Sequence, residues 1–312
     1  MPEIHAFIGS DKNAGKTTAL LYEYQKFRLQ GKQIVLTGIG INGESIDAYD
    51  GHSKPTILAH TNTYVITNPE SANLLGPLIE IVKHLLPPRY SRPLVLIKML
   101  APAEILIQGP NEKWEFQHLK EDVNSILPHS LILLDGSIDR QFLGHSDICD
   151  YLYYCLYSSH RIPQRNKAKS QMRSLLLPLY NRSLPPIPKG SNWCGWDVKN
   201  QLLGFSDNPA FLDPDLQILL SQRPSPLHLL WLGGALTSKL AERLCAIPKL
   251  NVILEDHTLW QNVSTGKVKI PQHIWLRQKP ALKKIYLREE IAWDDVLPSG
   301  CQIQNLYREA TP

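Results

Sequence analysis

Residues 9–18 read Gly9-Ser10-Asp11-Lys12-Asn13-Ala14-Gly15-Lys16-Thr17-Thr18. The apolar run His5–Ile8 stops at this stretch, which is typical of a buried strand that enters a tight turn. Residues 17–30 then carry apolar and aromatic side chains at helical spacing, and Ile34–Leu36 is suited to a second strand. The order strand, glycine-bearing loop, helix and strand predicts a βαβ unit, and therefore a parallel sheet.

This stretch approximates the pattern G-x-x-x-x-G-K-[ST] of a phosphate-binding loop, or P-loop. Gly15, Lys16 and Thr17 stand at the required spacing, whereas Ser10 takes the place of the first glycine and Gly9 lies one residue early. Successive backbone N–H groups of such a loop, and of the helix that follows, form a cradle for anions. We therefore predict nucleotide binding by the loop residues Ser10, Asp11, Lys12, Asn13, Ala14, Gly15, Lys16, Thr17 and Thr18.

Four of these residues have distinct expected roles. Gly15 lets the backbone approach the phosphates closely because it has no side chain. Lys16 can reach the β- and γ-phosphates as a mobile point charge, and we assign it a catalytic role. The hydroxyl of Thr17 is suited to Mg²⁺, and Thr18 in the same helical turn reaches toward the α-phosphate.

A carboxylate for the Mg²⁺ side of the loop is expected at Asp135. This residue ends the apolar run Leu131–Leu134, which is typical of a fully buried strand. Open α/β sheets bind ligands at the carboxyl ends of their strands, so Asp135 is expected beside the loop as a metal ligand and catalytic group. Asp139 and Arg140 follow closely, and either contact the phosphates or cap the next helix.

The segment Thr37–Asp47 follows the second strand and contains three glycines. A loop at this position would lie next to the γ-phosphate and act as a switch, with Gly40 and Asp47 as candidate contacts. Glu44 is a candidate catalytic group that holds Mg²⁺-bound water or orients the attacking water. The alternative interpretation is an ordinary surface turn.

The rest of the chain alternates between helix and strand patterns. Further strands are predicted at Tyr64–Thr67, Tyr151–Tyr157, Leu227–Leu232, Asn251–Leu254 and Lys284–Leu287, and helices at Glu70–Leu86, Phe116–Ile126 and Ala235–Cys245. Leu94–Leu100 and Ile105–Gln108 are predicted to pair as a hairpin. The expected fold class is α/β: a mostly parallel, P-loop NTPase-like sheet with helices on both faces, plus a C-terminal α/β portion.

Composition suggests three parts. Residues 1–157 are the predicted P-loop nucleotide-binding domain. No Asp or Glu occurs from Tyr151 to Trp196, and residues 158–196 read as a basic, proline-rich connector. Its basic stretch Arg161–Arg173 suits an anionic ligand or partner, or a solvated face near a domain boundary. Residues 197–312 are the C-terminal α/β portion, either separate or continuous with the first sheet.

Charge and cysteine content argue against several classes of protein. The formal net charge of +4 over 312 residues is too small to indicate nucleic-acid binding. Five scattered cysteines form no C-x-x-C pair, which argues against a disulfide framework and a structural zinc site. No basic segment precedes an apolar run at the N-terminus, and no apolar run approaches the length of a membrane span. We therefore expect a cytoplasmic protein without a signal peptide.

Several segments resemble, in the same order, the P-loop reactivase subunit of lysine 5,6-aminomutase. The most distinctive are Lys12–Thr18, similar to the K-N-A-G-K-T-T loop of that family, and Leu134–Arg140, similar to its D-G-A-x-x-R element. The other similar segments are Ile39–Asp47, Lys54–Ile57, Ile107–Pro110 and Leu232–Thr237. The chain departs from the family where Ile41-Asn42 replace a charged pair, Ser137 replaces an alanine, and Tyr151–Tyr157 replace small residues.

The resemblance implies a chaperone-like reactivating factor for an adenosylcobalamin-dependent aminomutase. Such a factor uses ATP and Mg²⁺ to drive release of damaged cobalamin, so that intact cofactor binds. The expected partner is the aminomutase or a second reactivase subunit, with a homodimer as another arrangement, and no membrane or nucleic acid.

The residues themselves leave the nucleotide and the reaction open. Asn166-Lys167-Ala168-Lys169 ends in Lys where a guanine-reading motif needs Asp, so we expect ATP, with GTP as the alternative. One alternative function is an ATP-dependent small-molecule ligase or kinase of the dethiobiotin-synthetase type. Another is a non-catalytic nucleotide-binding scaffold.

Overall fold

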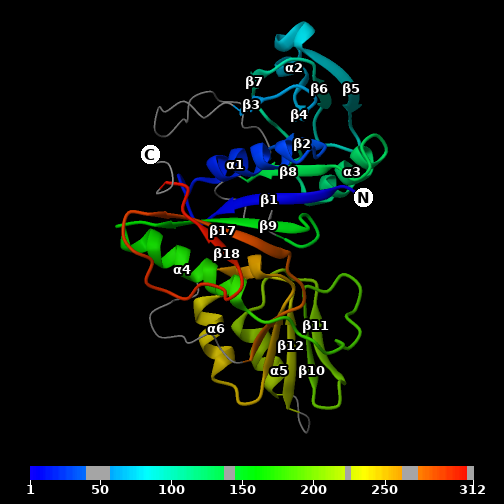
Figure 1. The fold of residues 1–312 in the computed structure, drawn as a ribbon. Helices are drawn as coiled ribbons and strands as arrows, with labels where there is room; N and C mark the ends of the chain where they lie inside the picture. Colours follow the sequence, from blue (N-terminus) through cyan, green and yellow to red (C-terminus); the bar gives the residue numbers. More distant parts are fainter. Residues whose placement is uncertain (40–56, 137–144, 222–225, 262–272, 308–312) are drawn as a thin grey trace. The chain divides into compact units, whose positions relative to one another are not determined.

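The computed structural model describes residues 1–39, 57–136, 145–221, 226–261 and 273–307 (Figure 1). These residues form a mixed α/β structure that divides into two compact units. The first unit comprises Met1–Tyr157, Pro280–Arg288 and Cys301–Pro312, and the second comprises Ser158–Lys279 and Glu289–Gly300. The chain therefore returns to the first unit twice after leaving it.

The first unit is built on a nine-stranded sheet with the order β18-β17-β9-β1-β8-β2-β4-β6-β5. Its strands are β1 (Glu3–Gly9), β2 (Ile34–Thr37), β4 (Tyr64–Thr67), β5 (Ile79–Leu85), β6 (Leu94–Met99), β8 (Leu131–Asp135), β9 (Tyr151–Ser158), β17 (Ala281–Glu289) and β18 (Gln302–Gln304). A separate antiparallel pair joins β3 (Ile57–Ala59) to β7 (Ala103–Ile105). The helices are α1 (Lys16–Leu29), α2 (Pro69–Leu75), the 3₁₀ turn η1 (Gly76–Leu78) and α3 (Lys113–Asn124).

The centre of this sheet is parallel and buried on both faces. β1 pairs in parallel with β8 and β9, and β2 pairs in parallel with β8 and β4. All four residues of Leu131–Leu134 in β8 are buried, although successive side chains point to opposite faces. Helix α1 packs against β1, β8 and β2, and places Leu20 and Tyr24 in a core with Phe7 and Leu133. The expected βαβ unit at the N-terminus is therefore present.

Two local predictions are wrong in the first unit. Glu70–Leu86 is not one helix, because α2 ends at Leu75 and β5 starts at Ile79. Gly76 has a positive φ of 48° and is followed by Pro77, which together interrupt a helix. The β-branched side chains at positions 79, 81 and 82 then favour a strand.

The hairpin predicted between Leu94–Leu100 and Ile105–Gln108 is also wrong. β6 pairs in antiparallel fashion with β4 and β5, whereas β7 pairs with β3. Almost every residue of β6 is buried, so this strand needs a neighbour on each side, and β4 and the preceding strand β5 take these two places. The edge of the sheet formed by β4, β6 and β5 is consequently antiparallel.

The second unit has its own five-stranded sheet, with the order β11-β10-β12-β14-β16. Its elements are α4 (Ile162–Leu176), β10 (Trp193–Asp197), β11 (Leu202–Ser206), α5 (Asp213–Ser221), β12 (Leu227–Leu232), β13 (Leu236–Thr237), α6 (Ser238–Cys245), β14 (Asn251–Leu254), η3 (His257–Leu259), β15 (Trp260–Gln261) and β16 (Ile274–Leu276). β12, β14 and β16 are parallel, and β10 and β11 are antiparallel additions. The range 158–196 thus contains α4 and the start of β10. In the part of the chain that the structure describes, no helix is both long and apolar enough to cross a membrane.

Candidate functional site

The loop between β1 and α1 presents the N-terminus of the helix. Asn13 and Gly15 have positive φ angles of 59° and 90°, so the backbone curls between Gly9 and Lys16. No side chain caps α1, and no acidic residue lies in its first turn. The first N–H groups of a helix lack intrahelical acceptors and carry partial positive charge. This end of α1 is therefore suited to an anion.

The unusual start of the loop has a structural explanation. Ser10 is fully buried: its N–H donates to the carbonyl of Cys155 at 2.9 Å, and its Oγ accepts from the N–H of Tyr157 at 2.9 Å. Ser10 thus fastens the loop to β9. The tight position is Gly9, where a Cβ would lie 3.0 Å from Cβ of Ala14 and 3.2 Å from the Cys155 carbonyl oxygen. The packing therefore requires a glycine at position 9, one residue before the first glycine of the P-loop pattern.

The two lysines of the loop lie beside Asp11. Nζ of Lys16 donates to the backbone carbonyl of Asp11 at 3.1 Å, so its side chain folds back over the loop. The Asp11 carboxylate accepts from the backbone N–H of Lys12 at 2.8 Å. The cationic head of Lys16 is consequently held near the concave side of the loop.

Asp135 lies directly beside the start of α1. β1 and β8 run in register with Phe7 opposite Asp135, which brings the carboxylate to the edge where the loop begins. Oγ1 of Thr17 donates to Oδ2 of Asp135 at 3.1 Å. Oδ1 of Asp135 is buried and has no hydrogen-bond partner among the residues that the structure describes. Two residues 118 positions apart in sequence therefore meet at the loop.

The environment of Asp135 disfavours its charge. Burial raises the pKa of this carboxyl from 3.8 to about 6, although the Lys16 ammonium and the Thr17 hydrogen bond oppose the change. The residue as a whole keeps some exposed surface, whereas the carboxyl group itself is enclosed. A buried carboxylate with an unsatisfied oxygen needs a cation or a further donor.

Thr17 and Asp135 fit a hard cation such as Mg²⁺. A hydroxyl oxygen and a carboxylate oxygen are ligands that Mg²⁺ prefers, and the unpartnered Oδ1 supplies an open acceptor. The described residues contain no group of three or more His, Cys, Asp or Glu side chains placed to hold a metal. A cation at this point would therefore take most of its ligands from phosphate oxygens and water, which is usual for Mg²⁺.

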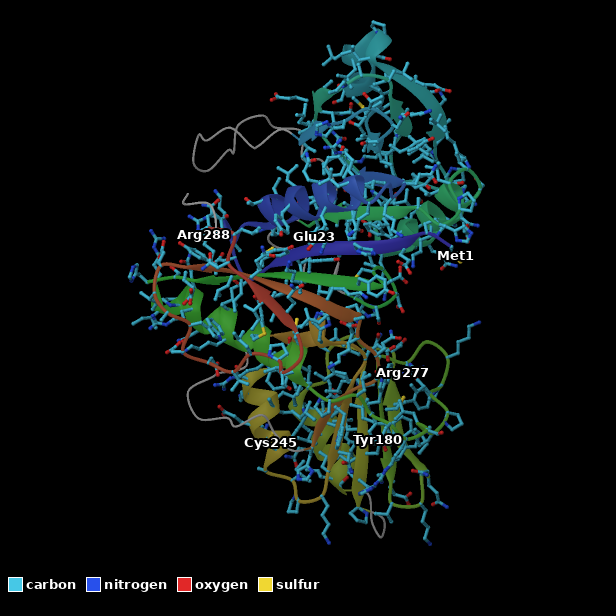
Figure 2. The ribbon with its side chains drawn as sticks, in the orientation of Figure 1. Met1, Glu23, Tyr180, Cys245, Arg277 and Arg288 are labelled. Atoms are coloured by element: carbon cyan, nitrogen blue, oxygen red, sulfur yellow. The ribbon has the colours of Figure 1, made fainter. Side chains whose placement is uncertain are left out.

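The other side of the loop carries three residues that the sequence analysis missed. Arg288, at the end of β17, donates from its guanidinium to the carbonyl of Asn13. The same guanidinium lies 5.2 Å from the ring centroid of Tyr157 and 5.0 Å from that of Tyr307. The hydroxyl of Tyr307 is 3.5 Å from Oγ1 of Thr18. Figure 2 labels Arg288 and also Glu23, a buried residue of α1. No motif spacing in the sequence points to Arg288, Tyr157 or Tyr307 as site residues.

The loop residues predicted from sequence, Ser10–Thr18, thus lie together with Asp135. Ala14 is buried under the loop, and Thr18 faces Tyr307. The remaining predicted site residues, Gly40, Glu44, Asp47, Asp139 and Arg140, lie outside the described residues.

Two other features of the molecule are weaker candidates for a functional site. Cys155 lies beside the loop, but burial raises the pKa of its thiol to about 12, so it is no nucleophile at neutral pH. The second unit has a pocket of about 670 Å³ between Tyr180, the 184–191 segment and Arg277. Figure 2 labels two of its lining residues, Tyr180 and Arg277. No carboxylate or histidine among the described residues lines it, and Arg277 is already paired with Glu255 at 3.1 Å. The loop at residues 9–18 is therefore a better candidate for the functional site than Cys155 or this pocket.

Comparisons with protein-family models, with curated proteins and with solved structures found no match to this chain.

Proposed function

We propose that the first unit is a P-loop nucleoside triphosphatase that binds ATP with Mg²⁺ at Ser10–Thr18. The observation that carries this proposal is the hydrogen bond between Thr17 and Asp135, whose other carboxylate oxygen is buried and has no partner in the described part of the chain. A hydroxyl in the first helical turn and a carboxylate from the adjacent parallel strand are the pair that a P-loop site needs for Mg²⁺.

In this proposal each residue of the loop has a separate task. The uncapped N-terminus of α1 holds the phosphates, and their close approach to Gly15 requires the Tyr307 hydroxyl to move away from that glycine. Lys16 leaves the Asp11 carbonyl to reach the β- and γ-phosphates, where it stabilises the charge that develops on them. A bound Mg²⁺ would neutralise phosphate charge. Water attacks the γ-phosphorus, the bond to the bridging oxygen breaks, and ADP and phosphate are released.

We further propose that hydrolysis serves to reactivate an adenosylcobalamin-dependent aminomutase. This part rests on the resemblance of Lys12–Thr18 and Leu134–Arg140 to the reactivase family. The nucleotide state would change how a surface of the protein binds its partner enzyme. The candidate water-orienting residue in this scheme is Glu44.

The test of hydrolysis compares phosphate release from Mg·ATP by the intact protein and by Lys16→Ala. We expect the variant to lose at least about 100-fold in rate, because one preformed charge contact to a transition state contributes this much. Lys32→Ala is the matched control, because Lys32 is an exposed lysine just beyond α1. Equal phosphate release by Lys16→Ala and the unchanged protein would contradict a catalytic loop.

The test of the partner is capture from native extract with and without ATP, with the bound proteins identified by mass. Nucleotide-dependent recovery of a cobalamin enzyme is expected. Turnover of ATP on a small carboxylic acid, with no protein partner present, would instead place the chain among the ligases or kinases.

A further inference from the structure

The strand order gives the site two chemically different sides. β8 lies on one side of β1, and β9 and then β17 lie on the other. The β8 side carries Asp135 and the Thr17 hydrogen bond, which mark the position expected for Mg²⁺ and the β- and γ-phosphates. In the proposed site, a nucleotide held with its γ-phosphate there would extend its nucleoside toward the β9 and β17 side, because Thr18, the residue expected near the α-phosphate, lies against Tyr307.

That second side presents flat, cationic and aromatic groups. The guanidinium of Arg288 lies near the rings of both Tyr157 and Tyr307, at 5.2 and 5.0 Å from their centroids. No ion pair between Arg288 and a carboxylate is found among the described residues. Its hydrogen bond to the Asn13 carbonyl holds the guanidinium beside the loop. The fold holds these two groups in place, since Arg288 lies near the end of β17 and Tyr157 near the end of β9.

Tyr307 brings an aromatic ring to the nucleoside end of the loop. Its hydroxyl is 3.5 Å from Oγ1 of Thr18, the residue expected near the α-phosphate. A Cβ added to Gly15 would lie only 2.7 Å from this hydroxyl, so the ring stands directly against the loop. Tyr307 is nevertheless 43% exposed, which leaves part of its surface open to a ligand.

We propose that Arg288 and Tyr307, supported by Tyr157, form the nucleoside subsite of the P-loop site and stack against the base. Aromatic rings and the guanidinium plane are the surfaces on which nucleobases stack, and every base has a face suited to them. This inference rests on the proposed function, because it names the residues that contact the nucleoside, the part of the nucleotide that the phosphate loop does not hold.

The experiment separates base from phosphate by using two ligands. Calorimetry measures the dissociation constants of ATP and of inorganic tripolyphosphate, both with Mg²⁺, for the full chain and its variants. We expect Tyr307→Ala and Arg288→Ala to weaken ATP about tenfold and tripolyphosphate no more than about threefold. Tyr307→Phe keeps the ring and should stay within about threefold of the unchanged protein for ATP. Trp114→Ala is the matched control, because Trp114 is a comparably exposed aromatic residue on α3.

The outcomes that overturn the subsite differ from those that overturn the function. Binding of both ligands by the unchanged protein, with no effect of Tyr307→Ala or Arg288→Ala on ATP, removes the subsite alone. If the substitutions weaken the binding of ATP and of tripolyphosphate equally, the two residues contact the phosphates and not the base. If Tyr307→Ala binds ATP more tightly than the unchanged protein, the ring obstructs the site. Failure of the unchanged protein to bind either ligand overturns the P-loop assignment and the subsite with it.

Discussion

At the scale of single residues, Asp135 combines a cost in folding with a use in binding. Its carboxyl is enclosed at the edge of the sheet, and its only described hydrogen bond comes from Thr17. A pKa of about 6 in the folded protein, against 3.8 ordinarily, corresponds to about 3 kcal/mol of stability lost when the group ionises. A cation at Oδ1 would offset this loss, so the same residue that weakens the free protein would strengthen its complex.

The first prediction follows from the direction of that pKa change. Because the folded protein holds the proton more tightly, stability is highest at low pH and falls as pH rises from about 4 to about 6. Asp135→Asn has no charge to bury, so it should be more stable than the unchanged protein above pH 6, by up to about 3 kcal/mol. The difference should vanish near pH 4. Denaturant unfolding of both proteins across this range, without nucleotide, is the measurement, and a difference independent of pH would refute the argument.

Single residues also show where sequence reasoning reaches its limit. Asp135 could be found because a carboxylate after a buried strand meets the loop of a neighbouring parallel strand by geometry alone. From the sequence, Ser10 could be identified only as a departure from the P-loop pattern, since its hydrogen bonds join it to β9, about 145 residues later. Arg288 is 275 residues from Asn13, and nothing local marks it. Contacts of this kind depend on which strands become neighbours.

At the scale of elements, a buried cluster joins α1 to β17. Glu23 of α1 is 1% exposed, and its carboxylate accepts a hydrogen bond from the hydroxyl of Tyr286. Nζ of Lys284 lies 3.5 Å from the same carboxylate and is also buried. Helix α1, which follows the candidate phosphate loop, is thus fastened to a strand that lies more than 250 residues later in the sequence.

The second prediction concerns this cluster. Glu23→Gln should destabilise the protein by about 3–5 kcal/mol, because it leaves the Lys284 ammonium buried without a counter-charge. Lys113→Gln is the matched control, since the Lys113–Asp147 pair is about half exposed on both partners and should contribute less than about 1 kcal/mol. Equilibrium unfolding in urea measures both changes. Similar small losses for the two variants would show that Glu23 and Lys284 are not coupled in the folded protein.

Elements differ in how well sequence predicts them. The apolar runs that became β1, β2, β4, β8 and β9 were recognisable, because parallel strands buried on both faces are almost wholly apolar. The prediction of one helix over 70–86 was wrong because only the first half of this range has helical spacing. Gly76 and Pro77 end the helix there. Strand pairing was harder to predict, since β6 pairs with β4 and with the preceding strand β5, which the sequence pattern assigned to a helix, and not with the strand that follows it.

At the scale of the whole molecule, the end of the chain completes the sheet that carries the candidate site. Three buried rings from β1, β9 and β17 stack on one another in the first unit. The ring centroids of Phe7 and Tyr153 are 4.6 Å apart, and those of Tyr153 and Tyr286 are 6.5 Å apart. Tyr286 belongs to β17, which the chain reaches only after it has formed most of the second unit. The nucleotide-binding domain expected at residues 1–157 would therefore lack two strands and the proposed nucleoside subsite.

The last prediction tests this dependence by shortening the chain. A protein ending at Lys279 loses β17 and β18, exposes Tyr153, and leaves Glu23 without Tyr286 and Lys284. We expect it to lose cooperative thermal unfolding, to bind a hydrophobic dye and to bind no ATP. A protein ending at Gln304 keeps both strands and removes Tyr307, so it should unfold cooperatively and bind ATP about tenfold more weakly. Adding the separate peptide 280–312 to the shorter protein should restore folding, because this peptide supplies the side chains that contact Glu23 and Tyr153. Full stability and ATP binding by the protein ending at Lys279 would show that residues 1–157 suffice, and that the late strands are an addition to a complete site.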